Sequence, residues 1–241
     1  MTSAQTAALE PAWVLHHRSF RDSSEILDLF TVTHGRIGVV AKGVRQVRRR
    51  QRIVPAPFLP LAVSWRGRGE LFTLTGVEST GPALRAKGRR LMSMFYVNEL
   101  ILRLVQRHDP HPGLFQIYGK TLSDLADGEA EAGVLRSFEK RLLEELGYGL
   151  QLNSDEFDGN PIDGSARYEY ILEQGPRRVA DDRKGQLIVS GASLLALHGD
   201  NFESATTLRD AQRLLSAALR LYLGDKPMKT RKVLLEMKER V

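Results

Sequence analysis

The residues of this chain best suited to chemistry are a run of cations that no acidic residue interrupts. Between Asp28 and Glu70 the sequence contains no carboxylate. Cations without opposite charges beside them cannot pair among themselves, and the phosphates of a nucleic-acid backbone supply regularly spaced anions. The run therefore predicts a nucleic-acid-binding surface. Its members are Arg36, Lys42, Arg45, Arg48, Arg49, Arg50, Arg52, Arg66 and Arg68.

A second pattern resembles a phosphate-binding loop but lacks its spacing. Gly119-Lys120-Thr121 matches the end of a P-loop, which requires four residues between its glycines. Here five residues separate Gly113 from Gly119. The segment also has helical periodicity and follows no expected strand, so its backbone N–H groups are not free to cradle a phosphate. We do not expect nucleotide binding there.

Acidic residues cluster near position 158 without forming a recognisable metal site. Phe157 occupies a place where a calcium loop requires an oxygen ligand, so solvated turns explain the cluster better than a nuclease centre. The six histidines include no H-E-x-x-H spacing. We expect no catalytic residue, no metal site and no cofactor, and we expect that the protein is not an enzyme. The acidic residues concerned are Asp155, Glu156, Asp158 and Asp163.

Composition sets the broad class of protein. The chain has 241 residues, a net charge of +6 and 42% hydrophobic residues, enough for one large domain or two small ones. It contains no cysteine, which excludes disulfides and thiolate zinc sites and agrees with a reducing cytosol. No apolar run approaches the roughly 18 residues of a membrane span, and residues 1–10 lack a signal-peptide layout.

The elements that must position the cations are short strands. Apolar and β-branched runs punctuated by Gly, Pro and Ser predict strands at 11–17, 25–32, 36–42, 58–66 and 70–78. His34-Gly35 predicts a tight turn because glycine accepts a positive φ. A longer connection, 43–57, follows the third strand. Five short strands with this spacing predict an OB-type barrel.

An OB-type barrel binds its ligand through strands two and three and the loops after strands one and four. The first of these loops is expected at residues 18–21, with Arg18, Phe20 and Arg21, and the second at residues 66–69. Cations follow phosphates, and a flat ring offers a surface on which a base stacks. Two alternatives stay open: Phe20 plugs the barrel mouth, or the arginines only keep the barrel soluble.

The remainder of the chain has helical periodicity. We expect helices from about 91, at 113–126, at 131–146 ending at Gly147, at 190–198 and from 206 or 207 to 224, with a last short basic helix from Lys229. Thr207-x-x-Asp210 resembles a capping arrangement. Residues 150–180 form an irregular insertion with one strand near 167–172. The domains are expected at 1–80 and 81–241, an α+β fold whose five-stranded barrel packs on a mainly helical domain with a small β insertion.

Ordered motifs along the whole chain resemble the bacterial recombination mediator family RecO. They begin with Arg18-Ser19-Phe20-Arg21-Asp22-Ser23-Ser24-Glu25, Phe30-Thr31, His34-Gly35 and Ala41-Lys42-Gly43-Val44-Arg45. They continue with Tyr96-Val97-Asn98-Glu99-Leu100, Arg136-Ser137-Phe138-Glu139, Leu146-Gly147-Tyr148-Gly149 and Lys226-Pro227-Met228-Lys229-Thr230-Arg231. No single motif is diagnostic, whereas their order is.

The resemblance implies a non-enzymatic role in recombinational DNA repair. It implies binding of single- and double-stranded DNA, annealing of complementary strands, and help in loading recombinase onto strands coated by single-strand binding protein. RecR and the C-terminal tail of single-strand binding protein are the implied protein partners. We expect a protein that is monomeric alone, cytoplasmic and nucleoid-associated, with no membrane contact.

One feature departs from many members of that family, which carry a four-cysteine zinc site after the Gly-Tyr-Gly segment. The insertion Leu150 to Arg183 contains neither cysteine nor histidine. Zinc requires about four such ligands within reach. The chain therefore resembles the metal-free branch of the family.

Two sets of site residues follow from these arguments. An acidic tail with an apolar end calls for arginines beside apolar surface, although Arg136 and Arg209 could instead pair with local carboxylates. The chain could also be an adaptor that recruits acidic tails and contacts DNA incidentally, and a metal-dependent nuclease is a third, weaker alternative. The expected tail-binding residues are Arg136, Leu208, Arg209 and Arg213. The expected DNA contacts are Arg18, Phe20, Arg21, Arg36, Lys42, Arg45, Arg48, Arg49, Arg50, Arg66 and Arg68.

Overall fold

The structure is a computed structural model that describes residues 5–21, 23–42, 55–180, 185, 187–224, 226–230 and 232–233. By their contacts these residues form two compact units. The first contains the chain up to Ala126 together with the segment from Met228 onward, and the second runs from Asp127 to Pro227. The second unit is thus inserted in the sequence of the first. The division predicted from sequence, at 80/81, stays a prediction.

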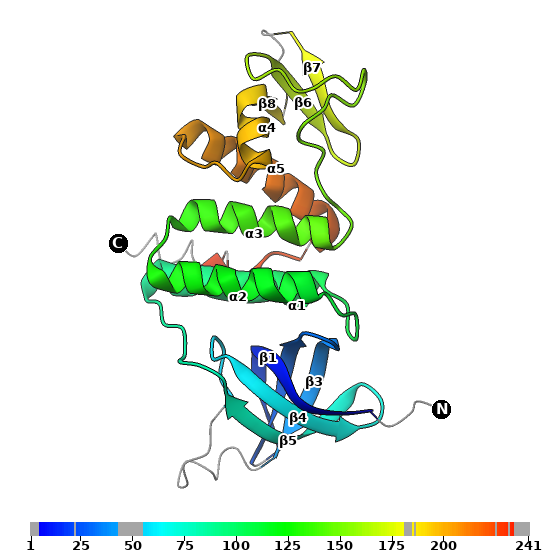
Figure 1. The fold of residues 1–241 in the computed structure, drawn as a ribbon, viewed down its shortest axis with the longest axis vertical. Coiled ribbons are helices and arrows are strands. Elements are labelled where there is room, and N and C mark those ends of the chain that lie inside the picture. The colour runs from blue at the N-terminus through cyan, green and yellow to red at the C-terminus, as the bar shows by residue number, and fades with distance from the viewer. Residues whose placement is uncertain are drawn as a thin grey trace. The chain divides into compact units, whose positions relative to one another are not determined.

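Five strands close into a barrel in the first unit (Figure 1). They are β1 (Gln5–Phe20), β2 (Ser24–Thr31), β3 (Gly35–Ala41), β4 (Leu61–Gly67) and β5 (Leu71–Ser79), in the spatial order β1-β2-β3-β5-β4. The strands pair antiparallel except β3 with β5, whose parallel pairing brings together strands on either side of the long connection. The predicted OB-type α+β fold is confirmed.

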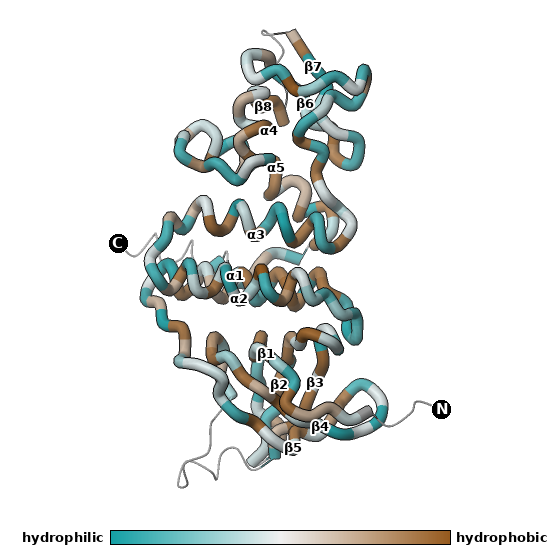
Figure 2. Tube along the Cα trace, viewed as in Figure 1, coloured by the Kyte–Doolittle hydropathy of each residue, from teal (hydrophilic) through white to brown (hydrophobic). Residues whose placement is uncertain are grey.

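The barrel is filled by alternate side chains of its strands. Leu27 and Leu29 on β2 point inward with Ile37 and Val39 on β3, and all four are almost fully buried. Trp65 plugs the same core. This period-two pattern reflects the alternation of side chains across a strand. In Figure 2 apolar residues accordingly recur along β2 and β3.

The β1–β2 hairpin is longer than the sequence predicted. Cross-strand pairing continues to Phe20 opposite Ser24, which leaves residues 21–23 as the connection. Arg18 and Phe20 therefore lie at the end of a strand and not in a loop, as the sequence analysis had it. The error arose because the polar segment after Leu15 lacks an alternating apolar pattern, while its pairing is imposed by β2. Arg66 likewise belongs to β4.

Two helices cover one end of the barrel, α1 (Gly88–Leu104) and α2 (Pro112–Asp127) (Figure 1). A buried polar chain joins the helices to the barrel. The Asn98 side-chain amide donates to the carbonyl of Leu15 at 2.9 Å and accepts a hydrogen bond from the Tyr118 hydroxyl at 2.6 Å. Buried polar groups that satisfy each other in this way fix one relative placement of helix and strand.

The segment after Met228 returns to α1 of the same unit. The Glu99 carboxylate accepts hydrogen bonds from the backbone N–H groups of Lys229 at 2.8 Å and Thr230 at 2.9 Å. It also accepts from the Thr230 hydroxyl at 2.7 Å. A carboxylate at a helix start satisfies N–H groups that have no partner within the helix.

The second unit combines three helices with a small sheet. It contains α3 (Glu131–Glu145), α4 (Gly191–His198) and α5 (Ala205–Leu223), and a sheet of order β7-β6-β8 made by β6 (Arg167–Ile171), β7 (Gly175–Val179) and β8 (Ile188–Ser190). The sequence predicted β6 alone, because Gly-Pro-Arg-Arg-Val in β7 carries no apolar alternation and β8 has only three residues.

The start of α5 corrects a predicted cap. Ser204, not Thr207, is the N-cap residue, and its side chain accepts a hydrogen bond from the backbone N–H of Thr206. Asp210 instead accepts a hydrogen bond from the Ser193 hydroxyl at 2.8 Å, which links α5 to α4. Among the described residues, no helix is long and apolar enough to cross a membrane.

Candidate nucleic-acid interface

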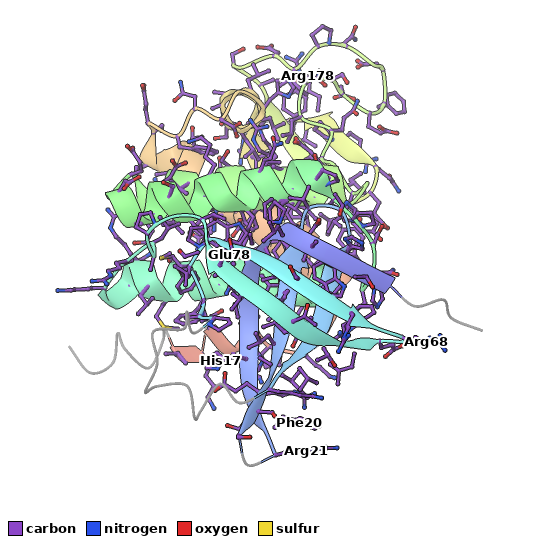
Figure 3. The ribbon with its side chains drawn as sticks, turned by 60° about the horizontal axis from the view of Figure 1, so that its bottom comes forward. His17, Phe20, Arg21, Arg68, Glu78 and Arg178 are labelled. Atoms are coloured by element: carbon purple, nitrogen blue, oxygen red, sulfur yellow. The ribbon has the colours of Figure 1, made fainter. Side chains whose placement is uncertain are left out.

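The tip of the β1–β2 hairpin presents a ring and a guanidinium together (Figure 3). Arg21 has a φ of 53°, which turns the chain sharply after β1. Its guanidinium carbon lies 5.1 Å from the centroid of the half-buried Phe20 ring, within the range of a cation–π contact. Phe20 lies outside the barrel core defined by the described residues. The pair thus forms a flat, positively charged surface at the hairpin tip.

Register places Arg18 and Arg66 on the same side of the sheet. Arg18 pairs with Ile26, Ile26 with Val40, Val40 with Thr73, and Thr73 with Arg66. Directly opposed residues project to the same face, and the intervening neighbours such as Leu27 and Phe72 fill the core. Both arginines are exposed. The outer face of the barrel therefore carries cations at both ends of one cross-strand row.

The β4–β5 hairpin ends in a short loop that exposes Arg68 (Figure 3). Gly67 and Gly69 on either side have φ values of 158° and 78°. A Cβ at Gly67 would lie 3.2 Å from the Cα of Phe72, whereas one at Gly69 would meet nothing within 4 Å. Glycine is therefore needed for packing at the first position and for backbone conformation at the second.

The Arg36 side chain forms its hydrogen bond inside the first unit. Its Nε donates to the carbonyl of Val105 at 3.1 Å, and its backbone carbonyl accepts from the N–H of His108. Burial, followed by the nearby Arg107, lowers the pKa of Arg36, and Asp28 acts in the opposite direction. Arg107 itself pairs with Asp28 at 2.7 Å. The counter-charge for this part of the run is Asp28, the carboxylate that directly precedes it.

Of the remaining predicted DNA contacts, the structure describes one, Lys42. Lys42 is exposed and directly follows β3. Ala41 pairs with Glu25, close to the pair Phe20–Ser24, so Lys42 lies at the barrel end that carries the β1–β2 tip. The predicted contacts outside the described residues are Arg45, Arg48, Arg49 and Arg50.

Sequence reasoning missed a basic segment at the start of α1. Arg85, Lys87 and Arg89 are exposed, and Arg90 is half-buried. Lys87 is the N-cap residue of α1, and no acidic residue occupies the first turn. The free N–H groups and positive dipole end of a helix start favour anions. Four cations in six residues were visible in the sequence but lay beyond the acid-free run.

The predicted tail-binding residues fall into two environments. Arg136 is buried and donates to Glu139 at 2.6 Å, the local pairing that the sequence analysis left open. Arg209 is exposed, and its guanidinium bonds only weakly to the Ala205 carbonyl at 3.2 Å and to the Thr206 hydroxyl at 3.4 Å. Its α5 neighbours are the half-buried Leu208 and Arg213, which lies 3.5 Å from Asp210.

The acidic residues clustered in the second unit accept hydrogen bonds within the loop that contains them. The buried Asp155 carboxylate accepts hydrogen bonds from the backbone N–H groups of Phe157 at 2.8 Å and Arg178 at 2.7 Å. Hydrogen bonds from Asn160 and Ser165 lower the pKa values of Asp158 and Asp163. Within the described residues no three metal-binding side chains converge. The carboxylates organise turns.

The fold and this surface define a class: an α+β protein with an OB-type barrel and basic hairpins. Two family models match the chain, Recombination protein O N terminal over residues 6–83 and Recombination protein O C terminal over residues 85–232. The chain belongs to the RecO family.

Relatives described as DNA repair protein RecO resemble this chain over almost its whole length. The protein of Alkalilimnicola ehrlichii is 47% identical over 231 residues, which cover 95% of this chain and 91% of the relative. That of Nitrosococcus oceani is 42% identical, covering 95% and 94%. That of Aromatoleum aromaticum is 42% identical, covering 99% and 100%.

Proposed function

We propose that this chain is a non-enzymatic protein of recombinational DNA repair that binds and anneals DNA strands. It would help to load recombinase onto single strands coated by single-strand binding protein, with RecR as its partner at the nucleoid. Membership of the RecO family supports the repair role. The observation that carries DNA binding is the cross-strand row on the outside of the barrel, which has exposed Arg18 at one end and exposed Arg66 at the other.

The proposed interface joins three exposed features of the first unit. The Phe20–Arg21 pair offers a stacking surface with a positive charge, and Arg68 extends the row beyond β4. The basic segment at the start of α1 adds Lys87 and Arg89. None of these groups reads base edges in an obvious pattern, so binding would follow the backbone and tolerate any sequence. Arg36 is left out of this interface because its guanidinium is engaged inside the unit.

A salt titration of single-strand binding tests the interface. Each phosphate neutralised on a single strand contributes about −0.7 to the slope of log affinity against log salt. Replacing Arg66 and Arg68 together with alanine should flatten that slope by about one to one and a half units. The paired replacement of Arg141 and Arg220, exposed on the second unit, serves as a charge-matched control. An unchanged slope in the barrel variant would remove the β4–β5 hairpin from the interface.

Annealing of complementary strands with and without magnesium separates the proposal from its alternatives. Annealing without cleavage is the expected result. Absence of annealing together with retained binding of acidic tail peptides would favour a pure adaptor. Cleavage that requires magnesium would favour a nuclease. The last two outcomes both contradict the proposal.

The second unit is the proposed site for the tail of single-strand binding protein. The exposed Arg209 lies near the N-terminus of α5, as its fifth residue, next to the half-buried Leu208, so a carboxylate and an apolar side chain could bind side by side. The planar guanidinium matches a carboxylate in two-point geometry. Arg213 lies one turn further along the same helix. Arg136 could contribute only by exchanging Glu139 for a carboxylate of the tail.

A further inference from the structure

A pocket of about 310 Å³ opens in the second unit, and its lining contains none of the proposed DNA-binding or tail-binding residues. The Gly-Tyr-Gly segment after α3, the β6–β7 turn and the last turns of α5 line it. We call it the tyrosine pocket. Its size lies at the lower end of the range of ligand sites, enough for one long side chain. The residues that carry the argument are Tyr148, Tyr170, Glu173, Leu221 and Tyr222.

Aromatic rings form the walls of the tyrosine pocket. Tyr148 and Tyr222 stack with their centroids 3.9 Å apart and their planes 17° from parallel. Tyr170 is buried, whereas Tyr148 is 46% exposed. Leu221 is 47% exposed beside them. A stacked pair with one partly open ring presents a negative π-face to solvent, and that face attracts cations.

The charged side chains at the tyrosine pocket are acidic. Glu173 lies with its carboxylate 3.5 Å from the Tyr222 hydroxyl, and Glu156 acts electrostatically on Tyr170. The described lining residues include no lysine or arginine, although the whole chain carries a net charge of +6. Nucleotides and acidic peptides require cations around their anionic groups. They therefore do not match this lining, whereas a cation does.

Glycines keep the tyrosine pocket open. A Cβ on Gly175 would lie 3.3 Å from the Cβ of Gln151 and 3.4 Å from that of Glu156, so any side chain there would crowd the floor. Gly147 has a φ of 81°, which turns the chain after α3 and brings Tyr148 over Tyr222. Burial, and then the charge of Glu173, raise the pKa of Tyr222. The hydroxyl therefore keeps its proton and donates toward Glu173.

We propose that the tyrosine pocket binds an arginine side chain from a segment of a partner protein. The guanidinium would stack on the exposed Tyr148 ring and pair with the Glu173 carboxylate, and an adjacent apolar residue would contact Leu221. A planar guanidinium suits both contacts, since it stacks on aromatic faces and pairs with carboxylates. Charge complementarity selects this occupant: the protein as a whole repels cations, so affinity for one must come from local groups.

A labelled six-residue peptide with one central arginine beside a leucine tests the proposal on the full chain. Its matched control has citrulline in place of arginine, which keeps the shape and removes the charge. We expect the arginine peptide to bind at least about tenfold more tightly than the citrulline peptide, as two local attractive contacts to a partly desolvated cation allow. With ¹³C-labelled tyrosine, the resonances of Tyr148 and Tyr222 should shift on titration.

Matched variants locate the contacts. Glu173→Gln should lower the affinity for the arginine peptide about fivefold or more and leave the citrulline peptide unaffected. Glu203→Gln, an equal charge change at an exposed position of the same unit, should alter neither. Tyr148→Phe keeps the ring and should retain binding, whereas Tyr148→Ala should lose most of it. Circular dichroism of each variant checks that the unit is folded.

Three results would overturn the proposal. Absence of binding by the arginine peptide removes the site. Equal binding of the arginine and citrulline peptides would mean that the pocket accepts a side chain of this shape without regard to its charge. Binding of an acidic peptide that is lost in Tyr148→Ala would mean that the pocket takes anions. The proposed function places strand annealing on the first unit, so we expect its outcome to be independent of these results.

Discussion

The arginines of the acid-free run have different roles, although the sequence presents them alike. Arg66 is exposed on the outer face of β4, whereas the Arg36 guanidinium is held at the Val105 carbonyl inside the first unit. The difference lies in what the fold brings beside each side chain. Arg36 meets the end of α1 and the Arg107–Asp28 pair, while Arg66 pairs across the sheet with Thr6 and Thr73. The charge pattern of the sequence therefore predicted a DNA-binding surface, but not which of the arginines belong to it.

At the residue scale, the Phe20 ring should act in DNA binding more than in stability. Phe20→Ala should weaken single-strand binding by about 1 to 3 kcal/mol, the usual contribution of one stacked base. The melting temperature should change little, because the ring lies outside the barrel core of the described residues. Fluorescence anisotropy with an oligonucleotide and a thermal melt measure the two quantities. A large loss of stability with unchanged affinity would identify the ring as a plug.

Asp155 should stabilise the loop that its buried carboxylate organises. Asp155→Ala leaves the N–H groups of Phe157 and Arg178 without their acceptor and should cost roughly 2 to 3 kcal/mol. Hydrogen exchange at those two amides should accelerate. Asp158→Ala removes an exposed carboxylate from the same loop and should have a much smaller effect. Equal effects of the two substitutions would contradict a special role for Asp155.

At the element scale, the β2–β3 turn depends on a glycine for two separate reasons. Gly35 has a φ of 63°, and a Cβ there would lie 2.1 Å from the backbone oxygen of Asp109. The turn therefore touches the segment between α1 and α2 at backbone level. The sequence identified the turn and its positive φ, but the close approach of Asp109 depends on packing between distant parts of the chain.

Substitution of Gly35 should destabilise the fold both through its positive φ and through the clash with Asp109. Gly35→Ala should lower the free energy of unfolding by about 3 kcal/mol, the sum of left-handed strain and overpacking. Gly69→Ala is the matched control, because its φ is also positive, at 78°, and its Cβ would meet nothing within 4 Å. It should cost only about 1 to 2 kcal/mol. Denaturant unfolding followed by tryptophan fluorescence suits the test, since Trp13 and Trp65 both lie in the first unit. Equal losses would show that the Asp109 contact relaxes without cost.

At the scale of the whole molecule, the two compact units separate the proposed activities. The barrel cations belong to the first unit, and both Arg209 and the tyrosine pocket belong to the second. The second unit is inserted between α2 and the segment from Met228, whose backbone N–H groups bind Glu99 of α1. The chain thus leaves the first unit after α2 and re-enters it at Met228.

This separation predicts that a substitution in one unit spares the activity of the other. Arg209→Glu should remove most affinity for a synthetic acidic tail peptide, because it replaces an exposed cation by an anion at the start of α5. Binding of naked DNA should fall much less. Arg66→Ala with Arg68→Ala should give the opposite result. Peptide and oligonucleotide anisotropy measured on both variants test the pattern. Retained peptide binding by Arg209→Glu would place the tail site elsewhere.

The sequence by itself determined the barrel, most helices and the family, because these depend on local periodicity, turn residues and the order of short motifs. Alternation in β2 and β3 and the glycine of the His34-Gly35 turn were sufficient to predict a strand pair. The three-residue β8 and the apolar-poor β7 were missed, since β6 imposes their pairing. Only the tertiary structure could decide which cations point outward, because register between strands, and not position in sequence, places Arg18 and Arg66 at the two ends of one outward-facing row. The tyrosine pocket also depends on the tertiary structure, because its walls come from residues about 75 positions apart in the sequence.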